Sequence, residues 1–142
     1  MRPAHRAGPR RRALLPAGVV VLVLSGLAAG CGSSTPAYCT DASQLKTSVQ
    51  DLGNVDVASN GLGSLQAALS KVQADATSFA ADAKSAFPSQ TAALKTALSG
   101  LQGAITSAKG QPAATAATAV ASSVVQVKNS ASALQSAISG NC

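Results

Sequence analysis

Several residue types that supply most enzyme chemistry are rare or missing in this sequence. The chain has no Glu and no Trp, and its single His and single Met stand at positions 5 and 1. No Arg occurs after position 12, so residues 31–142 offer ionisable or nucleophilic groups only on Asp, Lys, Ser, Thr, Tyr38 and cysteine. General acid–base catalysis most often uses His, and zinc or copper sites mostly need His or several thiolates. The sequence therefore predicts a protein that is not an enzyme and that holds no metal and no cofactor.

Aromatic residues and clustered positive charge are also scarce. The chain has one Tyr and two Phe, too few to form a platform on which nucleic-acid bases stack. The formal net charge is +6, but five of the eleven basic residues are arginines within the first twelve positions. The remainder holds six separated lysines against five aspartates and is nearly neutral. We therefore expect no binding to nucleic acid.

The first thirty residues have the pattern of an export signal. Residues 1–12 carry the five arginines and no acid, residues 13–30 are almost wholly apolar, and small residues Ala28, Ala29 and Gly30 end the run. A positive region, an apolar region and a small-residue cleavage site are typical of a signal peptide. The stretch RRALL (11–15) is also similar to the twin-arginine export motif, so the route of export stays open between that pathway and the ordinary one.

A cysteine stands where the apolar run stops. The sequence LAAGC, Leu27 to Cys31, resembles the lipobox of bacterial lipoproteins, although Ala28 occupies the position where that family usually has a bulky aliphatic residue. The resemblance covers residues 1–31 alone. It implies that the chain is cleaved before Cys31 and that the Cys31 thiol receives a diacylglyceryl group, which contains fatty acids such as palmitate. It also implies attachment to the extracytoplasmic face of the cell membrane. Residues 31–38 would then be the lipidated N-terminus and tether; the alternative is an uncleaved membrane span.

Two cysteines remain once Cys31 is lipidated. Cys39 and Cys142 form an even pair in a chain expected outside the cytoplasm, where disulfides form and persist. An exposed free thiol at either position would be a liability there. We therefore predict a Cys39–Cys142 disulfide with a structural role, and two free thiols as the alternative.

Apolar residues recur at alternating steps of three and four in four segments, which is the spacing of one helical stripe. Gly and Pro separate the segments and predict helices near 40–52, 61–87, 89–109 and 113–139. Short links make neighbouring helices antiparallel, so residues 39–142 are expected to form an all-α, up-down-up-down four-helix bundle. This topology brings Cys39 and Cys142 to the same end. The Ser- and Thr-rich composition leaves a disordered or glycosylated stalk as the alternative.

Two short motifs are weak matches to functional patterns. SQLK (43–46) has the Ser-x-x-Lys spacing of some acyl-transfer enzymes, but the partner motifs of those enzymes are absent. DLGNVD (51–56) carries oxygen-bearing side chains but lacks the spacing and the final Glu of a calcium loop. An exposed helix face and turn chemistry account for these two motifs better.

The unequal lengths of the first two predicted helices indicate a thinly covered region at the membrane-distal end. The loop 53–61 would have to run nearly extended to join them, since a chain spans at most ~3.3–3.6 Å per residue. The apolar residues beneath this loop are a candidate partner surface, with a tightly packed loop as the alternative. The surface comprises Val55, Val57, Leu62, Leu65, Leu69, Leu101, Ile105 and Val120.

These observations predict an envelope-anchored lipoprotein that acts as a non-catalytic interaction or accessory module. Its partners would be the membrane, through Cys31, and an unidentified envelope protein or ligand. The alternative function is a carrier or sensor that binds a small apolar ligand within the helical bundle, because seams rich in alanine can leave space between helices.

Overall fold

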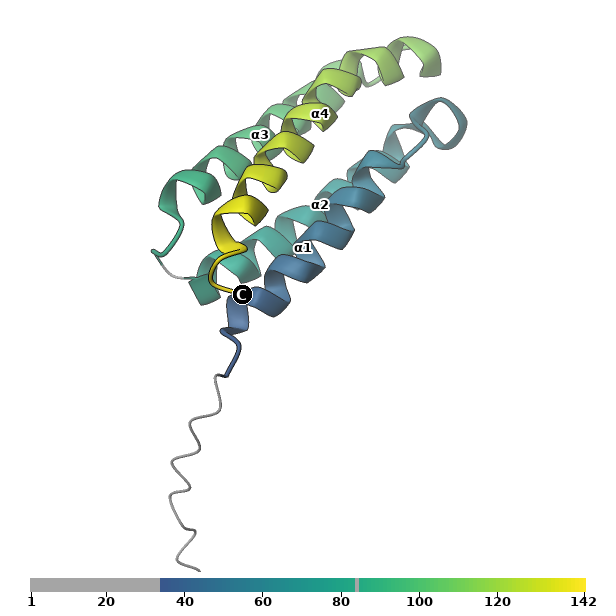
Figure 1. The fold of residues 1–142 in the computed structure, drawn as a ribbon. Coiled ribbons are helices and arrows are strands. Elements are labelled where there is room, and N and C mark those ends of the chain that lie inside the picture. Colours follow the sequence, from purple (N-terminus) through teal and green to yellow (C-terminus); the bar gives the residue numbers. More distant parts are fainter. Residues whose placement is uncertain (1–33, 84) are drawn as a thin grey trace, which may run out of the picture. The chain divides into compact units, whose positions relative to one another are not determined.

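The computed structural model describes residues 34–83 and 85–142, which contain four α-helices. The helices are α1 (Ala37–Gly53), α2 (Val57–Ala83), α3 (Pro88–Ala108) and α4 (Ala113–Ile138), as Figure 1 shows. The predicted all-α class is confirmed. The predicted signal peptide and lipidated Cys31 lie outside the described residues.

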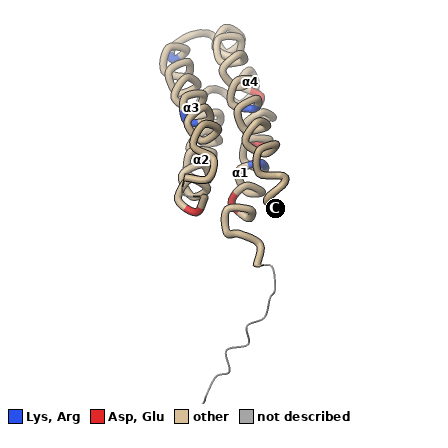
Figure 2. Tube along the Cα trace, turned by 60° about the vertical axis from the view of Figure 1, so that its left-hand side comes forward, with Lys and Arg blue, Asp and Glu red and all other residues tan. Residues whose placement is uncertain are grey.

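The four helices form a bundle of two antiparallel pairs. α1 packs along α2 and α3 packs along α4, and the bundle closes through contacts of α4 with α1 and of α2 with α3. α2 and α4 also contact each other across the diagonal of the bundle. Charged residues are few and stand apart along the helices (Figure 2). The helices are therefore held together mainly by their apolar faces.

The core consists of the apolar stripes that the sequence spacing predicts. Each helix contributes a row of side chains at most 8% exposed, spaced by three and four residues. Six of them are alanines, which let the helices approach closely but bury little area. The largest fully buried apolar side chains are Phe79, Leu52, Leu65, Leu69, Leu94, Leu101, Ile105, Leu134, Val72, Val120 and Val127.

All three aromatic residues of the chain gather at one end of the bundle. Tyr38 meets Phe79 and Phe87 edge-on, with ring centroids 6.2 and 5.6 Å apart. Cys39 lies next to Tyr38 and is bonded to Cys142, 103 residues away in sequence. The predicted disulfide is confirmed, and it joins the start of α1 to the residues that follow α4. This end of the bundle is called the stapled end below.

The helix bounds differ from those predicted. α1 begins three residues earlier, at Ala37 after Pro36. α2 ends at Ala83 instead of near 87, and Pro88 is the first residue of α3. Proline disfavours helical geometry in the residue before it but fits the first turn of a helix. Pro88 therefore both stops the earlier segment and starts the next.

The connection between α1 and α2 is not the extended loop that the sequence predicts. Residues 54–56 form the turn, and residues 57–60 already form a helical turn in which Asn60 N donates to Asp56 O. Asp56 accepts hydrogen bonds from the backbone N and hydroxyl of Ser59, at 3.0 and 2.6 Å. Gly61 then takes φ 74° and ψ 172°, a conformation open essentially to glycine alone, and redirects the chain into the rest of α2.

Candidate functional site

The candidate site is a groove between α4 and the end of α1. Lys71 of α2 pairs with Asp51 near the end of α1 at 3.3 Å, which aligns the middle of α2 with that end. The first part of α2 and the residues before it therefore extend beyond α1, beside α4. A hollow of ≈ 350 Å³ remains between them. Its walls are Leu52, Gly53, Val55, Asp56, Val57, Leu65, Ala117, Val120, Ala121, Val124, Val125 and Lys128.

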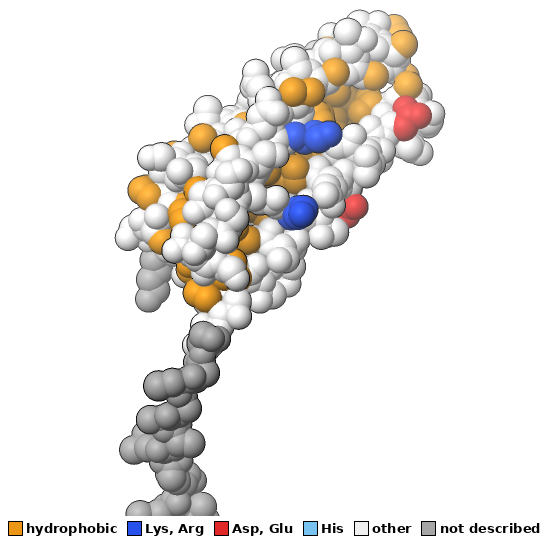
Figure 3. All heavy atoms as spheres, viewed as in Figure 1, with side chains coloured by type: hydrophobic (Ala, Val, Ile, Leu, Met, Phe, Trp, Pro, Cys, Tyr) orange, Lys and Arg blue, Asp and Glu red, His pale blue; other side chains and the backbone are white. Residues whose placement is uncertain are grey.

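The hollow has a buried apolar floor and a partly open rim. Leu65 and Val120 of the floor are 1% and 2% exposed. Val125 on the rim is 53% exposed, the one large hydrophobic side chain that the described residues leave open to solvent. Figure 3 shows hydrophobic side chains lying in a depression of the surface near a lysine and an acidic residue. We call this depression, with the walls given above, the distal hollow.

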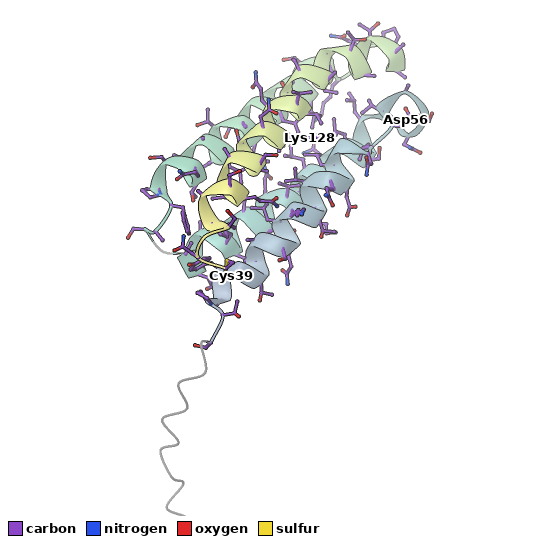
Figure 4. The ribbon with its side chains drawn as sticks, in the orientation of Figure 1. Cys39, Asp56 and Lys128 are labelled. Carbon is purple, nitrogen blue, oxygen red and sulfur yellow. A yellow bond between two sulfur atoms is a disulfide. The ribbon has the colours of Figure 1, made fainter. Side chains whose placement is uncertain are left out.

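Lys128 crosses the groove at the inner end of the distal hollow. Its Cδ lies so close to Gly53 that a β-carbon on Gly53 would come within 3.1 Å of it, and its Nζ would be 3.5 Å away. Gly53 is the last residue of α1, and the carbonyls at a helix C-terminus carry partial negative charge. The Lys128 ammonium therefore lies where α1 attracts a cation (Figure 4).

A second hollow, whose walls are mostly polar residues, continues the groove toward the stapled end. It has a volume of ≈ 230 Å³ and shares Lys128 with the distal hollow. Its other walls are Lys46, Val49, Gln50, Ala131, Ser132 and Gln135. No aspartate lines it, and Lys71–Asp51 is the one ion pair formed within the described residues, so Lys46 and Lys128 both lack an acidic partner there. We call it the lysine hollow.

The structure separates the predicted partner surface into two groups. Val55, Val57, Leu65 and Val120 come together around the distal hollow. Leu69, Leu101 and Ile105 are fully buried core residues that do not line it, and Leu62 is half-buried against the core. The sequence analysis did not include the other walls of the distal hollow, which are Leu52, Gly53, Asp56, Ala117, Ala121, Val124, Val125 and Lys128. For Ala117 and Ala121, the available signal was their spacing of four residues on the face of α4 that lacks a full-length neighbour.

The two weak motifs have ordinary structural roles. The Ser43 hydroxyl donates to Cys39 O at 3.1 Å within α1. Asp51 pairs with Lys71, and Asp56 caps the turn before Ser59. Within residues 34–83 and 85–142, no group of three or more His, Cys, Asp or Glu side chains is placed to hold a metal ion.

Another groove lies between α2 and α3. It has a volume of ≈ 390 Å³, and Phe79, Leu94, Leu98 and Leu134 form its apolar depth. Lys95, Gln73, Thr77 and other polar residues stand at its mouth. Through this groove, buried apolar side chains of the core border an opening between α2 and α3.

No known protein family, curated protein or solved structure matches the chain. None of the described helices is both long enough and apolar enough to span a membrane.

Asp41 of α1 lies near two other aspartates, Asp75 and Asp82 of α2. Asp41 Oδ2 is buried without a hydrogen-bond partner. Burial, and then the negative charges of Asp82 and Asp75, raise the pKa of Asp41 above its ordinary value. At Asp56, the hydrogen bonds from Ser59 lower the carboxyl pKa instead.

We expect Asp41→Asn to stabilise the domain at pH 7. Because the pKa of Asp41 is raised by folding, its ionised form opposes folding, and that cost is absent below pH ~4, where the carboxyl is protonated in both states. The urea midpoint of the variant should exceed that of the wild type at pH 7 and approach it at pH 3.

Asp56→Asn is the control of opposite sign. It should lower the midpoint at pH 7, because the lowered pKa of Asp56 contributes stability that is lost only as the pH falls. Equal midpoints for Asp41→Asn and wild type at pH 7 would contradict the assignment.

Proposed function

We propose that this chain is a lipid-anchored, extracytoplasmic binding module without catalytic activity. The observation that carries the proposal is the Cys39–Cys142 bond, because structural disulfides belong to compartments outside the reducing cytoplasm. It agrees with the export signal and with the resemblance of LAAGC to a lipobox. The residues available for chemistry in the grooves are Lys, Asp, Ser, Thr and Gln, which suit recognition better than acid–base catalysis.

The anchor would orient the binding surface. The segment between Cys31 and α1, residues 32–36, would reach only about 12 Å as flexible chain, so the stapled end would stand close to the membrane. α1 runs away from that end and the turn 54–56 lies at its far end. The distal hollow would therefore face away from the membrane, where it is accessible to other molecules of the envelope.

The test compares two neighbouring residues of α4. Val125→Glu places a charge on the rim of the distal hollow, whereas Gln126→Glu places the same charge on an exposed position that faces another seam. Molecules that co-purify with the membrane-held protein after crosslinking in intact cells are identified as proteins or lipids. We expect Val125→Glu to reduce at least one of them to background while Gln126→Glu retains it. Identical sets from wild type and both variants would refute the distal hollow as the binding surface.

A second candidate function is suggested by the α2–α3 groove. Its depth of Phe79, Leu94, Leu98 and Leu134 would suit a small apolar ligand carried partly within the bundle. In the same purification, such a ligand would be lost from Ala80→Leu, which fills that groove, and would be unaffected by Val125→Glu. These two variants therefore distinguish the two functions.

A further inference from the structure

We infer that the α1–α4 groove binds a single-chain anionic amphiphile, with its carboxylate or phosphate head in the lysine hollow and its chain in the distal hollow. The inference rests on the proposed function, since it names the class of ligand that the module would bind. The groove combines an apolar hollow with two lysines, Lys46 and Lys128, that have no acidic partner among the described residues.

The distal hollow has the shape and lining for one alkyl chain. It follows α4 from Lys128 back to Ala117, which at 1.5 Å per residue is a length of about 16 Å. Ala117 and Ala121, one helical turn apart, keep that wall low, and the opposite wall is Val55, Val57 and Leu65. Burying an alkyl chain here removes apolar surface of both partners from water, at roughly 0.8 kcal/mol per buried CH₂.

The lysine hollow suits an anionic head. Lys46 of α1 and Lys128 of α4 approach it from opposite sides, and Gln50, Ser132 and Gln135 add hydrogen-bonding groups between them. Ammonium groups that face an anion form charge-assisted hydrogen bonds, which are stronger than neutral ones. The two lysines therefore give the groove a positive inner end.

The single acidic residue of the groove fixes the direction of the ligand. Asp56 lines the distal hollow, and its carboxylate stays ionised because its hydrogen bonds from Ser59 lower its pKa. An anionic head beside Asp56 would be repelled, whereas the lysine hollow contains no acid. The head therefore lies toward the stapled end and the end of the chain points toward the 54–56 turn.

The exposed surface favours an amphiphile over a protein partner. A stable protein interface buries about 800 Å² per partner around an apolar centre. Within the described residues, Val125 is the only large hydrophobic side chain that is exposed. The other apolar residues of the distal hollow are buried (Leu52, Val57, Leu65 and Val120) or half-buried (Val55, Ala117 and Val124), except for the small Ala121, which is exposed. An apolar lining that is mostly buried or half-buried can contact one alkyl chain laid into it, while a flat partner surface would reach only its exposed rim.

The test uses the membrane-held, full-length protein and a photoreactive fatty acid. A diazirine on the alkyl chain is activated, and the labelled residues are mapped by peptide mass spectrometry. We expect labelling of the walls of the distal hollow, on residues 117–125 and 55–57. Laurate and dodecyl phosphate, which distinguish a carboxylate from a phosphate head, should compete, and dodecanol, which lacks the charge, should compete weakly.

Two charge variants and one packing variant complete the test. Lys46→Gln with Lys128→Gln should lower labelling about tenfold, whereas the matched pair Lys95→Gln with Lys109→Gln should leave it unchanged. Ala121→Phe should block labelling by filling the hollow, and unchanged helical circular dichroism shows that each variant is folded. Equal labelling in both lysine pairs, or equal competition by dodecanol and laurate, would overturn the inference. If Val125→Glu still removes a co-purifying molecule in that case, the proposed function stands without it.

Discussion

Replacing Cys39 and Cys142 together by serine is expected to lower the free energy of unfolding by up to about 4.7 kcal/mol, because the bond closes a loop of about 100 residues in the unfolded chain. The domain is sensitive to such a loss, since six of its buried core positions are alanine and its only fully buried aromatic residue is Phe79. Chemical denaturation of oxidised wild type and of the double variant measures the difference.

Reduction provides the control for this prediction. A reductant should shift the wild-type transition to that of the double variant and leave the variant itself unchanged. A wild-type transition that does not respond to complete reduction would contradict a stabilising role of the Cys39–Cys142 bond.

Replacing Cys31 by alanine is expected to release the protein from the membrane fraction or to leave its signal attached. The reason is the resemblance of LAAGC to a lipobox, in which the thiol of Cys31 receives the diacylglyceryl group. Cell fractionation with intact-mass measurement distinguishes the lipidated, unprocessed and released forms.

The Cys39→Ser, Cys142→Ser variant is the matched control for Cys31→Ala. It also removes thiols, but it should remain in the membrane fraction, since neither residue belongs to the lipobox. Normal processing and unchanged membrane retention of Cys31→Ala would contradict the lipoprotein assignment.

Local spacing was enough to predict the four helices, and the pairing of the two remaining cysteines followed from their number and from the bundle topology. Alternating steps of three and four depend only on helix geometry, and short links leave few arrangements for four consecutive helices. The helix ends were harder. The turn at 57–60 depends on the Asp56–Ser59 hydrogen bonds and on the unusual backbone of Gly61, so a segment with several Gly and Asn residues became helical where a loop was predicted.

The candidate site was predictable only in part. Val55, Val57, Leu65 and Val120 follow from the helix-length argument, since they are apolar residues beside the shorter helix. The space itself is created by the small size of Ala117 and Ala121 and by the register of α1 against α4. Lys128 crosses to Gly53 through a contact between residues distant in sequence, which no local pattern encodes.

The bond between the two ends of the domain also determines how the protein would respond to mechanical force. A pull through the proposed anchor would enter the domain just before Cys39, where the Cys39–Cys142 bond ties the start of α1 to the residues that follow α4. Neither α1 nor α4 can then separate from the bundle starting at the stapled end, because the disulfide bond joins the start of α1 covalently to the residues that follow α4. The segment before α1 would therefore lengthen first under tension, while the bond keeps α1 and α4 together at the stapled end of the groove.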